Sequence, residues 1–231
     1  MFTINTRVFA GFKPLLQGVC ALSLALSGTV ALASTVSLDF TDSANFAGGT
    51  VSGYDFVLSA QNGSLTTNVG DRGGCEAGDS NGGTNLHNLA CDGDGLGVNN
   101  DEISYGSDSS QQSIRVTIDL FGKTRVESVE FLDLFQNEGG AGVHETAQMR
   151  INGGAITDIV AEGNIGGYLL YTLGQDFDGA SIVFEFFTSV VRQSDFAVAR
   201  INLSEVPIPG ALLLFGSGIL GLGFFRRKRQ S

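Results

Sequence analysis

The chain has 231 residues, a formal net charge of −11, 33 glycines, three cysteines and no tryptophan. This length fits one domain of sandwich size, or two small domains. A surface this acidic repels nucleic acid, so nucleic-acid binding is excluded, whereas divalent cations and neutral partners are compatible with it.

Residues 1–33 have the features of a secretion signal. Arg7 and Lys13 precede an apolar run, Leu15–Leu32, and the run ends in the small-x-small sequence Ala31-Leu32-Ala33. We expect signal peptidase to remove this segment during export. The run is almost long enough to span a membrane, so a retained N-terminal anchor stays open as an alternative.

Residues 34–205 form the expected exported domain. They contain seven basic and all 24 acidic residues, a formal charge of −17. Apolar and polar residues alternate from Ile114 to Leu120 and from Ile182 to Phe186, and again from Phe196 to Leu203 with a register break after Val198. Further strands are expected at 35–40, 54–60, 148–152 and 168–173. Between 129 and 135, the alternation places Val129, Phe131, Asp133 and Phe135 on one face of a strand.

Glycine-rich turn signals separate these segments, for example Gly48-Gly49, Asn152-Gly153-Gly154 and Asp178-Gly179. No sustained helical period occurs in the domain. Many short strands joined by such turns are typical of an all-β fold. We therefore predict an antiparallel β-sandwich, jelly-roll-like, between the N-terminal signal peptide and a C-terminal transmembrane helix.

The segment from Gly70 to Asp101 interrupts the strand pattern because it is rich in glycine, aspartate and asparagine. Export places Cys75 and Cys91 in an oxidising compartment, which favours a disulfide between them. Such a bond would close this long loop. A reduced, buried pair is the alternative.

Oxygen ligands are concentrated at the end of the same segment. Asp92, Asp94, Asn99 and Asp101 alternate with glycines that permit tight turns, a composition suited to calcium. The spacing does not match an EF-hand loop or a calcium-binding nonapeptide repeat. A calcium site and a solvated acidic turn are both open interpretations.

Enzymatic signatures are weak. His87 and His144 are the only histidines, and the nucleophile motif G-x-S-x-G is absent. Carboxylate pairs for glycoside hydrolysis remain open among 24 acids. Sugar sites use exposed aromatic rings, for which the chain offers four tyrosines and no tryptophan. The tyrosines are Tyr54, Tyr105, Tyr168 and Tyr171.

Residues 206–231 read as a short membrane anchor. Pro207 and Pro209 precede an uncharged stretch, Ala211–Phe225. The basic cluster that follows would stop translocation with the C-terminus in the cytoplasm. It consists of Arg226, Arg227, Lys228 and Arg229.

This tail resembles the PEP-CTERM sorting signal, on Val206, Pro207, Pro209, the apolar run and the basic cluster. Ile208 stands where the family name implies glutamate. The resemblance implies recognition by exosortase at the inner membrane of a Gram-negative bacterium, followed by processing and release to the cell surface or medium. Members of the family typically accompany exopolysaccharide and biofilm production.

The sequence therefore predicts a non-enzymatic surface or extracellular-matrix protein associated with exopolysaccharide. A carbohydrate-binding module and a secreted exopolysaccharide hydrolase are the alternatives. No cofactor is required by any motif, and calcium is the only ion that the sequence suggests.

Overall fold

The computed structural model describes residues 34–66, 88–99, 102–104, 111–136, 144–161, 167–188 and 194–206. One compact unit spans residues Ala33–Val206. The predicted signal peptide and the predicted sorting helix lie outside the described residues, as do Cys75 and Asp101. Within the described residues, no helix is long and apolar enough to cross a membrane.

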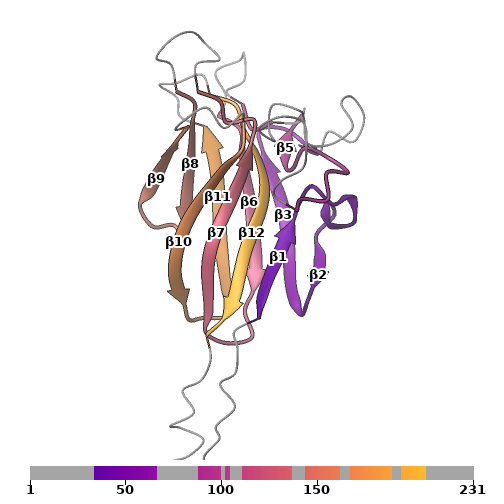
Figure 1. Cartoon of the computed structure of the whole chain (residues 1–231), viewed down its shortest axis with the longest axis vertical. Coiled ribbons are helices and arrows are strands. Elements are labelled where there is room, and N and C mark those ends of the chain that lie inside the picture. The colour runs from indigo at the N-terminus through magenta and orange to yellow at the C-terminus, as the bar shows by residue number, and fades with distance from the viewer. Residues whose placement is uncertain are drawn as a thin grey trace, which may run out of the picture. The chain divides into compact units, whose positions relative to one another are not determined.

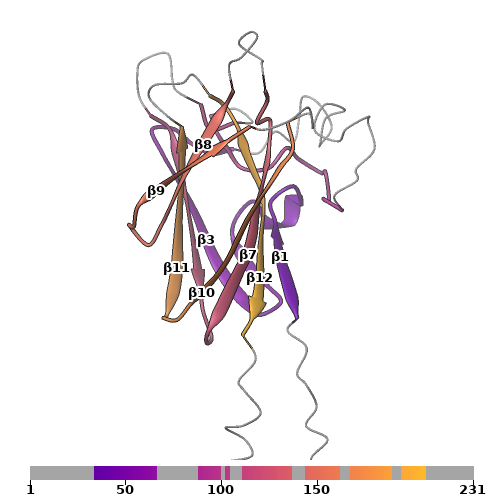
Figure 2. The ribbon, with the colours of Figure 1, turned by 60° about the vertical axis from the view of Figure 1, so that its left-hand side comes forward.

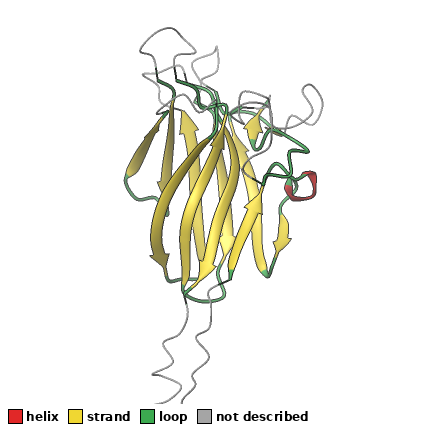
Figure 3. Ribbon diagram, in the orientation of Figure 1, coloured by secondary structure: helices red, strands yellow, loops and turns green. Residues whose placement is uncertain are grey.

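The domain consists of two antiparallel sheets, which confirms the predicted all-β sandwich. The sheets are two layers in Figure 2, and Figure 3 shows that a single short 3-10 turn, Ser43–Asn45, is the helical element among the described residues. The smaller sheet has the order β1-β12-β7-β10, with β1 (Thr35–Asp39), β12 (Ala197–Glu205), β7 (Thr124–Leu132) and β10 (Leu169–Phe177).

The larger sheet has the order β2-β3-β6-β11-β8-β9. Its strands are β2 (Gly49–Val51), β3 (Tyr54–Gln61), β6 (Ser113–Asp119), β11 (Ser181–Thr188), β8 (Thr146–Ile151) and β9 (Ile156–Val160). A separate pair, β4 (Leu65–Thr66) and β5 (Gly97–Val98), lies near one end of the sandwich (Figure 1).

The core lies between the two sheets and is rich in phenylalanine. Phe131 on β7 contacts Phe186 on β11 edge to face, with ring centroids 6.0 Å apart. It also contacts Phe196, just before β12, at 5.8 Å. Edge-to-face pairs contribute about 0.5–1.5 kcal/mol beyond the area they bury. The two layers are therefore joined by oriented aromatic contacts as well as by aliphatic packing.

The first and last strands of the domain are neighbours. β1 pairs with β12 in an antiparallel register that sets Thr35 opposite Ser204 and Asp39 opposite Arg200. The chain continues from Glu205 to Val206, whose amide donates to the carbonyl of Lys123 at 3.0 Å. The two flanking segments therefore join the domain at the same end of one strand pair.

The predicted alternation between 129 and 135 is wrong beyond Leu132. Asp133 has φ 55°, a left-handed conformation that ends β7. Leu134 is then buried in the main core, while Leu132 packs on the outer side of the sheet against Leu89, Ala197 and Ala199. The register break predicted after Val198 is confirmed, because the pairing of β12 with β7 shifts between Val198 and Arg200.

The smaller sheet gains residues toward its β10 edge. Asn202 and Leu203 are consecutive on β12, and they face Ser128 and Val126 on β7, which have one residue between them. Those two residues face Thr172 and Gln175 on β10, which have two residues between them. Extra residues of this kind bend a strand and increase its twist. β10 accordingly curves along the side of the sandwich (Figure 1).

Candidate functional site

A cleft of about 310 Å³ opens where β10, the edge of the smaller sheet, faces β8 and β9 at the edge of the larger one. Its size is near the lower end of the roughly 300–1,000 Å³ of small-molecule sites. The lining residues are Met149, Ile151, Gly154, Ala155, Thr157, Tyr171, Thr172, Leu173, Gln175 and Phe177.

The β10 wall is set by the register of the smaller sheet. Tyr171 lies opposite Val129, and Gln175 lies opposite Val126. Directly opposed residues share a face of a sheet, and both valines are fully buried between the layers. The tyrosine and the glutamine therefore face inward. Because the strand is at the edge and is bent by the bulge, these side chains line a cleft, and Tyr171 also packs against the core.

The bulge itself requires glycine. Gly174 has φ +59°, and a Cβ atom added there would lie 3.1 Å from Nη2 of Arg125. Residues with a Cβ rarely adopt this conformation. Gly174 thus permits the extra residue that returns Gln175 and Phe177 to the inner face.

The opposite wall is the β8–β9 hairpin. Asn152 and Gly153 have φ 50° and 68°, and the amide of Gly154 donates to the carbonyl of Ile151 at 2.9 Å. This is a type I′ turn, as the asparagine-glycine sequence predicts. The hairpin register pairs Met149 with Thr157, and both residues line the cleft.

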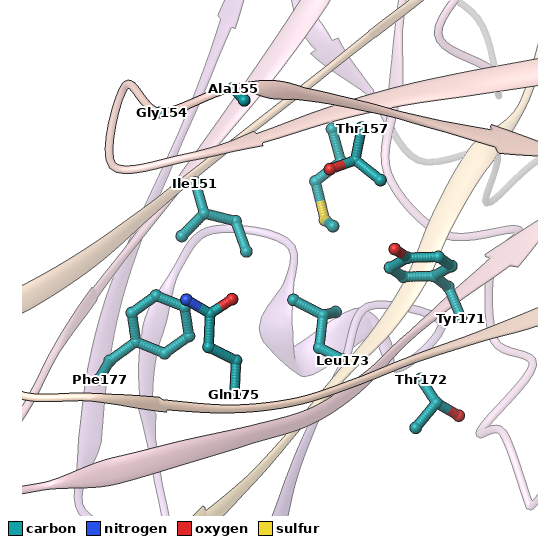
Figure 4. Close-up of a pocket in the computed structure, with 10 residues that line it drawn as sticks. Ile151, Gly154, Ala155, Thr157, Tyr171, Thr172, Leu173, Gln175 and Phe177 are labelled. Carbon is teal, nitrogen blue, oxygen red and sulfur yellow. The ribbon is translucent and has the colours of Figure 1, made fainter.

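The close-up in Figure 4 shows how the walls meet. Ile151 and Thr157 approach from the hairpin, and Tyr171, Gln175 and Phe177 approach from β10, while Thr172 points away. Two aromatic rings thus stand beside a hydroxyl group and an amide. Rings of this kind cover apolar faces of a ligand, while the amide and hydroxyl form directional hydrogen bonds.

Among the described residues that line the cleft none is charged, although the domain is strongly acidic. The three strands that form the cleft contain three charged residues, Arg150, Asp158 and Asp176. Each one is paired on an outer face. Arg150 donates to Glu185 at 2.6 Å, Gln148 donates to Asp158 at 2.7 Å, and Arg125 donates to Asp176 at 3.0 Å.

The ion pairs on the outer faces lower the pKa values of two carboxyl groups, Asp176 and Glu185. A hydrogen bond from Lys123, together with one from Arg125, holds the pKa of Asp176 below its ordinary value. Glu185 accepts from Arg115 and from Arg150, and these hydrogen bonds lower the pKa of Glu185. Both carboxylates are therefore ionised at neutral pH and remain paired on the outer faces, away from the cleft.

A second polar cluster, the Arg200 network, lies on the outer face of the smaller sheet. Arg200 donates to Asp39 at 2.8 Å and to Glu130 at 3.4 Å. Glu130 also accepts from Asn202 at 2.6 Å and from the Tyr168 hydroxyl at 3.1 Å. Burial, and then the charge and hydrogen bond of Glu130, raise the pKa of Tyr168, which keeps its hydroxyl group a donor.

This network fixes the segment Asn88–Asp92 to the sheet. Arg200 donates to the carbonyl of Asn88, and the amide of Ala90 donates to Asp39 at 3.1 Å. The amide of Cys91 donates to the hydroxyl of Thr41 at 3.0 Å. These structural contacts favour a stabilising role over a ligand site. The Cys75–Cys91 disulfide stays a prediction, because Cys75 lies outside the described residues.

The residues predicted to bind calcium take separate local roles. Asp92 is exposed and its amide donates to the carbonyl of Thr41, whereas Asp94 is only 2% exposed. The side-chain oxygen of Asn99 accepts from the amide of Ser64 at 2.8 Å. The described residues contain no group of three or more histidine, cysteine or acidic side chains placed to hold a metal ion. Calcium binding stays a prediction, since Asp101 is outside them.

The sequence offered four tyrosines as candidates for a sugar site, and of these Tyr171 lines the cleft. Tyr54 is buried in the core, Tyr168 belongs to the Arg200 network, and Tyr105 lies outside the described residues. Gln175 and Phe177 were missed because β10 was expected to end at residue 173. In the structure β10 continues past Gly174, which lies in its bulge.

Comparisons with known proteins leave the family open. No protein-family model matches the chain, and no curated protein sequence matches it. Solved structures with weak likeness include the CBM35 domain of Cellvibrio japonicus Abf62, at 14% identity and a TM-score of 0.34, covering 63% of this chain and 92% of that one. Another is the exo-β-1,3-galactanase of Phanerochaete chrysosporium, at 15% identity and a TM-score of 0.31, covering 68% and 30%.

A third is the GH26-CBM35 β-(1,4)-mannanase of Podospora anserina, at 12% identity and a TM-score of 0.32, covering 42% of this chain. This chain spans only 20% of the mannanase. TM-scores at this level are too low to support an argument about family or function.

Proposed function

We propose that this chain is an exported, non-enzymatic carbohydrate-binding protein of the cell surface or extracellular matrix, and that the cleft between β10 and the β8–β9 hairpin holds a polysaccharide. The observation that supports this most directly is the lining of the cleft. Tyr171 and Phe177 supply aromatic rings, while Gln175 and Thr157 supply an amide and a hydroxyl.

Sugars match this combination because a pyranose ring has apolar C–H faces and a rim of hydroxyl groups. An aromatic ring covers the apolar face, and an amide exchanges hydrogen bonds with the rim. The cleft also lies between two sheet edges rather than inside the core, so a long polymer is able to reach it. These features favour a chain-like ligand over a small enclosed one.

The same lining argues against hydrolysis in the cleft. Glycosidases generally need two carboxyl groups, one on each side of the scissile bond. None of the lining residues that the structure describes is acidic, and the carboxylates of Asp158, Asp176 and Glu185 are paired on outer faces. Binding without chemistry is therefore the function that this site supports best.

The proposed route to the cell surface depends on the chain ends. Signal peptidase would remove residues 1–33, and exosortase would recognise the tail from Val206 through Pro207, Pro209 and Arg226–Arg229. The partner in the matrix would be the exopolysaccharide with which such tails are associated. Export and sorting are separate from the cleft, and each is tested by itself.

Affinity electrophoresis and isothermal titration against a panel of polysaccharides test the binding function. We expect the purified full-length protein to bind at least one polysaccharide, and Tyr171→Ala to weaken that binding roughly tenfold. Phe121→Ala is the matched control, since Phe121 is an aromatic residue that is 74% exposed in the β6–β7 turn and is not among the residues lining the cleft. Equal binding by wild type and Tyr171→Ala would contradict the proposal.

A further inference from the structure

The strands that form the cleft contain few charged residues for so acidic a domain, and those residues point away from the cleft. The domain has a formal charge of −17, yet the three cleft strands contain only Arg150, Asp158 and Asp176 as charged residues. Strand alternation turns all three to the outer faces. On β8 the inward position next to Arg150 is Met149, and on β10 the inward position next to Asp176 is Gln175.

Charged groups on neighbouring strands also form ion pairs on the outer faces of the sheets, away from the cleft. Arg115 and Arg150 both donate to Glu185 on the outer face of the larger sheet. Lys123 and Arg125 form ion pairs with Asp176 at 3.0 Å on the outer face of the smaller sheet. A ligand in the cleft therefore meets no cation among the lining residues within the described part of the chain.

From this arrangement we infer that the cleft selects neutral polysaccharides and rejects those with uronate, sulfate or other anionic groups. The inference rests on the proposed function and specifies its ligand class. An anionic sugar would lose hydration on entering the cleft and would gain no opposite charge there. The acidic domain adds a repulsion that weakens as salt is raised.

Gln175 is the position where this selectivity can be reversed. Its amide lies inward between Leu173 and Phe177 (Figure 4). A lysine there would place an ammonium group beside the ligand, with a side chain of comparable length. The variant Gln175→Lys should then accept an anionic chain that the wild type rejects.

The experiment measures binding of the full-length protein to neutral glucan, mannan and galactan and to polygalacturonate and alginate, at low and at high salt. We expect the wild type to bind a neutral polymer with little salt dependence and to leave both polyuronates unbound. Gln175→Lys should lose affinity for the neutral polymer severalfold and bind a polyuronate at low salt. Val57→Lys is the matched control, because it adds the same charge at a side chain 67% exposed on β3, outside the cleft.

The outcomes separate the two proposals. Wild-type binding to a polyuronate alone, abolished by Tyr171→Ala, overturns the neutral-ligand inference and supports carbohydrate binding in the cleft. Absence of binding to any polymer overturns both. If Gln175→Lys gains no more polyuronate binding than Val57→Lys, the selectivity does not originate in the cleft and the inference is wrong.

Discussion

Arg200 and Asp39 are 161 positions apart in the sequence and lie opposite each other on β12 and β1, with Nη2 2.8 Å from Oδ2. Their side chains are only 10% and 17% exposed. Arg200 also contacts Glu130, whose side chain is 5% exposed. One guanidinium group therefore compensates two carboxylates that are largely shielded from water.

Removal of that guanidinium group should be costly. Arg200→Met leaves Asp39 and Glu130 shielded without their cation, and we expect the free energy of unfolding to fall by about 3 kcal/mol. Urea denaturation followed by circular dichroism measures this. Arg115→Met is the control, since the Arg115 side chain is 48% exposed and Glu185 keeps Arg150, so its cost should stay below about 1 kcal/mol. An equal loss of unfolding free energy in the two variants would show that burial does not set the strength of the Arg200 ion pairs.

Gly174 is expected to affect both stability and binding. Gly174→Ala forces a residue with a Cβ into a left-handed conformation and should destabilise the fold by about 1–2 kcal/mol. The altered bulge should also weaken polysaccharide binding, because Gln175 and Phe177 follow it directly. Thermal melting and titration measure the two effects. Gly122→Ala, at a glycine whose added Cβ meets no atom within 4 Å, should change neither.

The pH dependence of stability should reflect Glu185. Hydrogen bonds from Arg115 and Arg150 lower its folded-state pKa below the ordinary value of 4.5. The stabilisation is therefore complete above the unfolded-state pKa and is lost as pH falls through the lower folded-state value. Urea midpoints of the wild type should decline as pH is lowered from about 5 to about 3. Glu185→Gln should show a smaller decline over that range, and an unchanged slope would contradict the assignment.

Processing of the C-terminus should leave the domain intact. β12 ends at Glu205, so cleavage beyond Val206 removes no strand residue. We expect intact-mass measurement of the protein secreted by its host to find residues 1–33 and Arg226–Arg229 missing. A deletion of residues 207–231 should be secreted without passing through a membrane-bound form. Secreted protein that retains Arg226–Arg229 would refute the proposed sorting.

Much of the sandwich could be predicted from local pattern. Alternation in segments such as Ile114–Leu120 and Ile182–Phe186 predicts strands with one buried face, and the structure confirms them as β6 and β11. β9 was missed because Ile156-Thr157-Asp158-Ile159-Val160 is a short edge strand whose first residue is 52% exposed. The alternation was predicted to continue to residue 135, but β7 ends at Leu132, since no sequence pattern predicts the left-handed conformation of Asp133.

The cleft was beyond prediction for a different reason. Its walls come from Met149 to Thr157 and from Tyr171 to Phe177, and these strands belong to different sheets. Their approach depends on the pairing register and on bulges that accumulate from β12 to β10. A single sequence shows the alternation within a strand, but it does not show which strands lie at the edges of the sheets. The same holds for Arg200 and Asp39, which meet only because the first and last strands pair.

The pairing of β1 with β12 also determines how the domain responds to mechanical force. A pull that separates Thr35 from Ser204 opens the ladder one bond at a time from its free end, which is its weakest direction. Force that enters through only one of these two chain ends does not pull Thr35 and Ser204 apart, so it does not open the ladder from that end. Attachment through one end of the chain is thus the arrangement that does not peel β1 from β12.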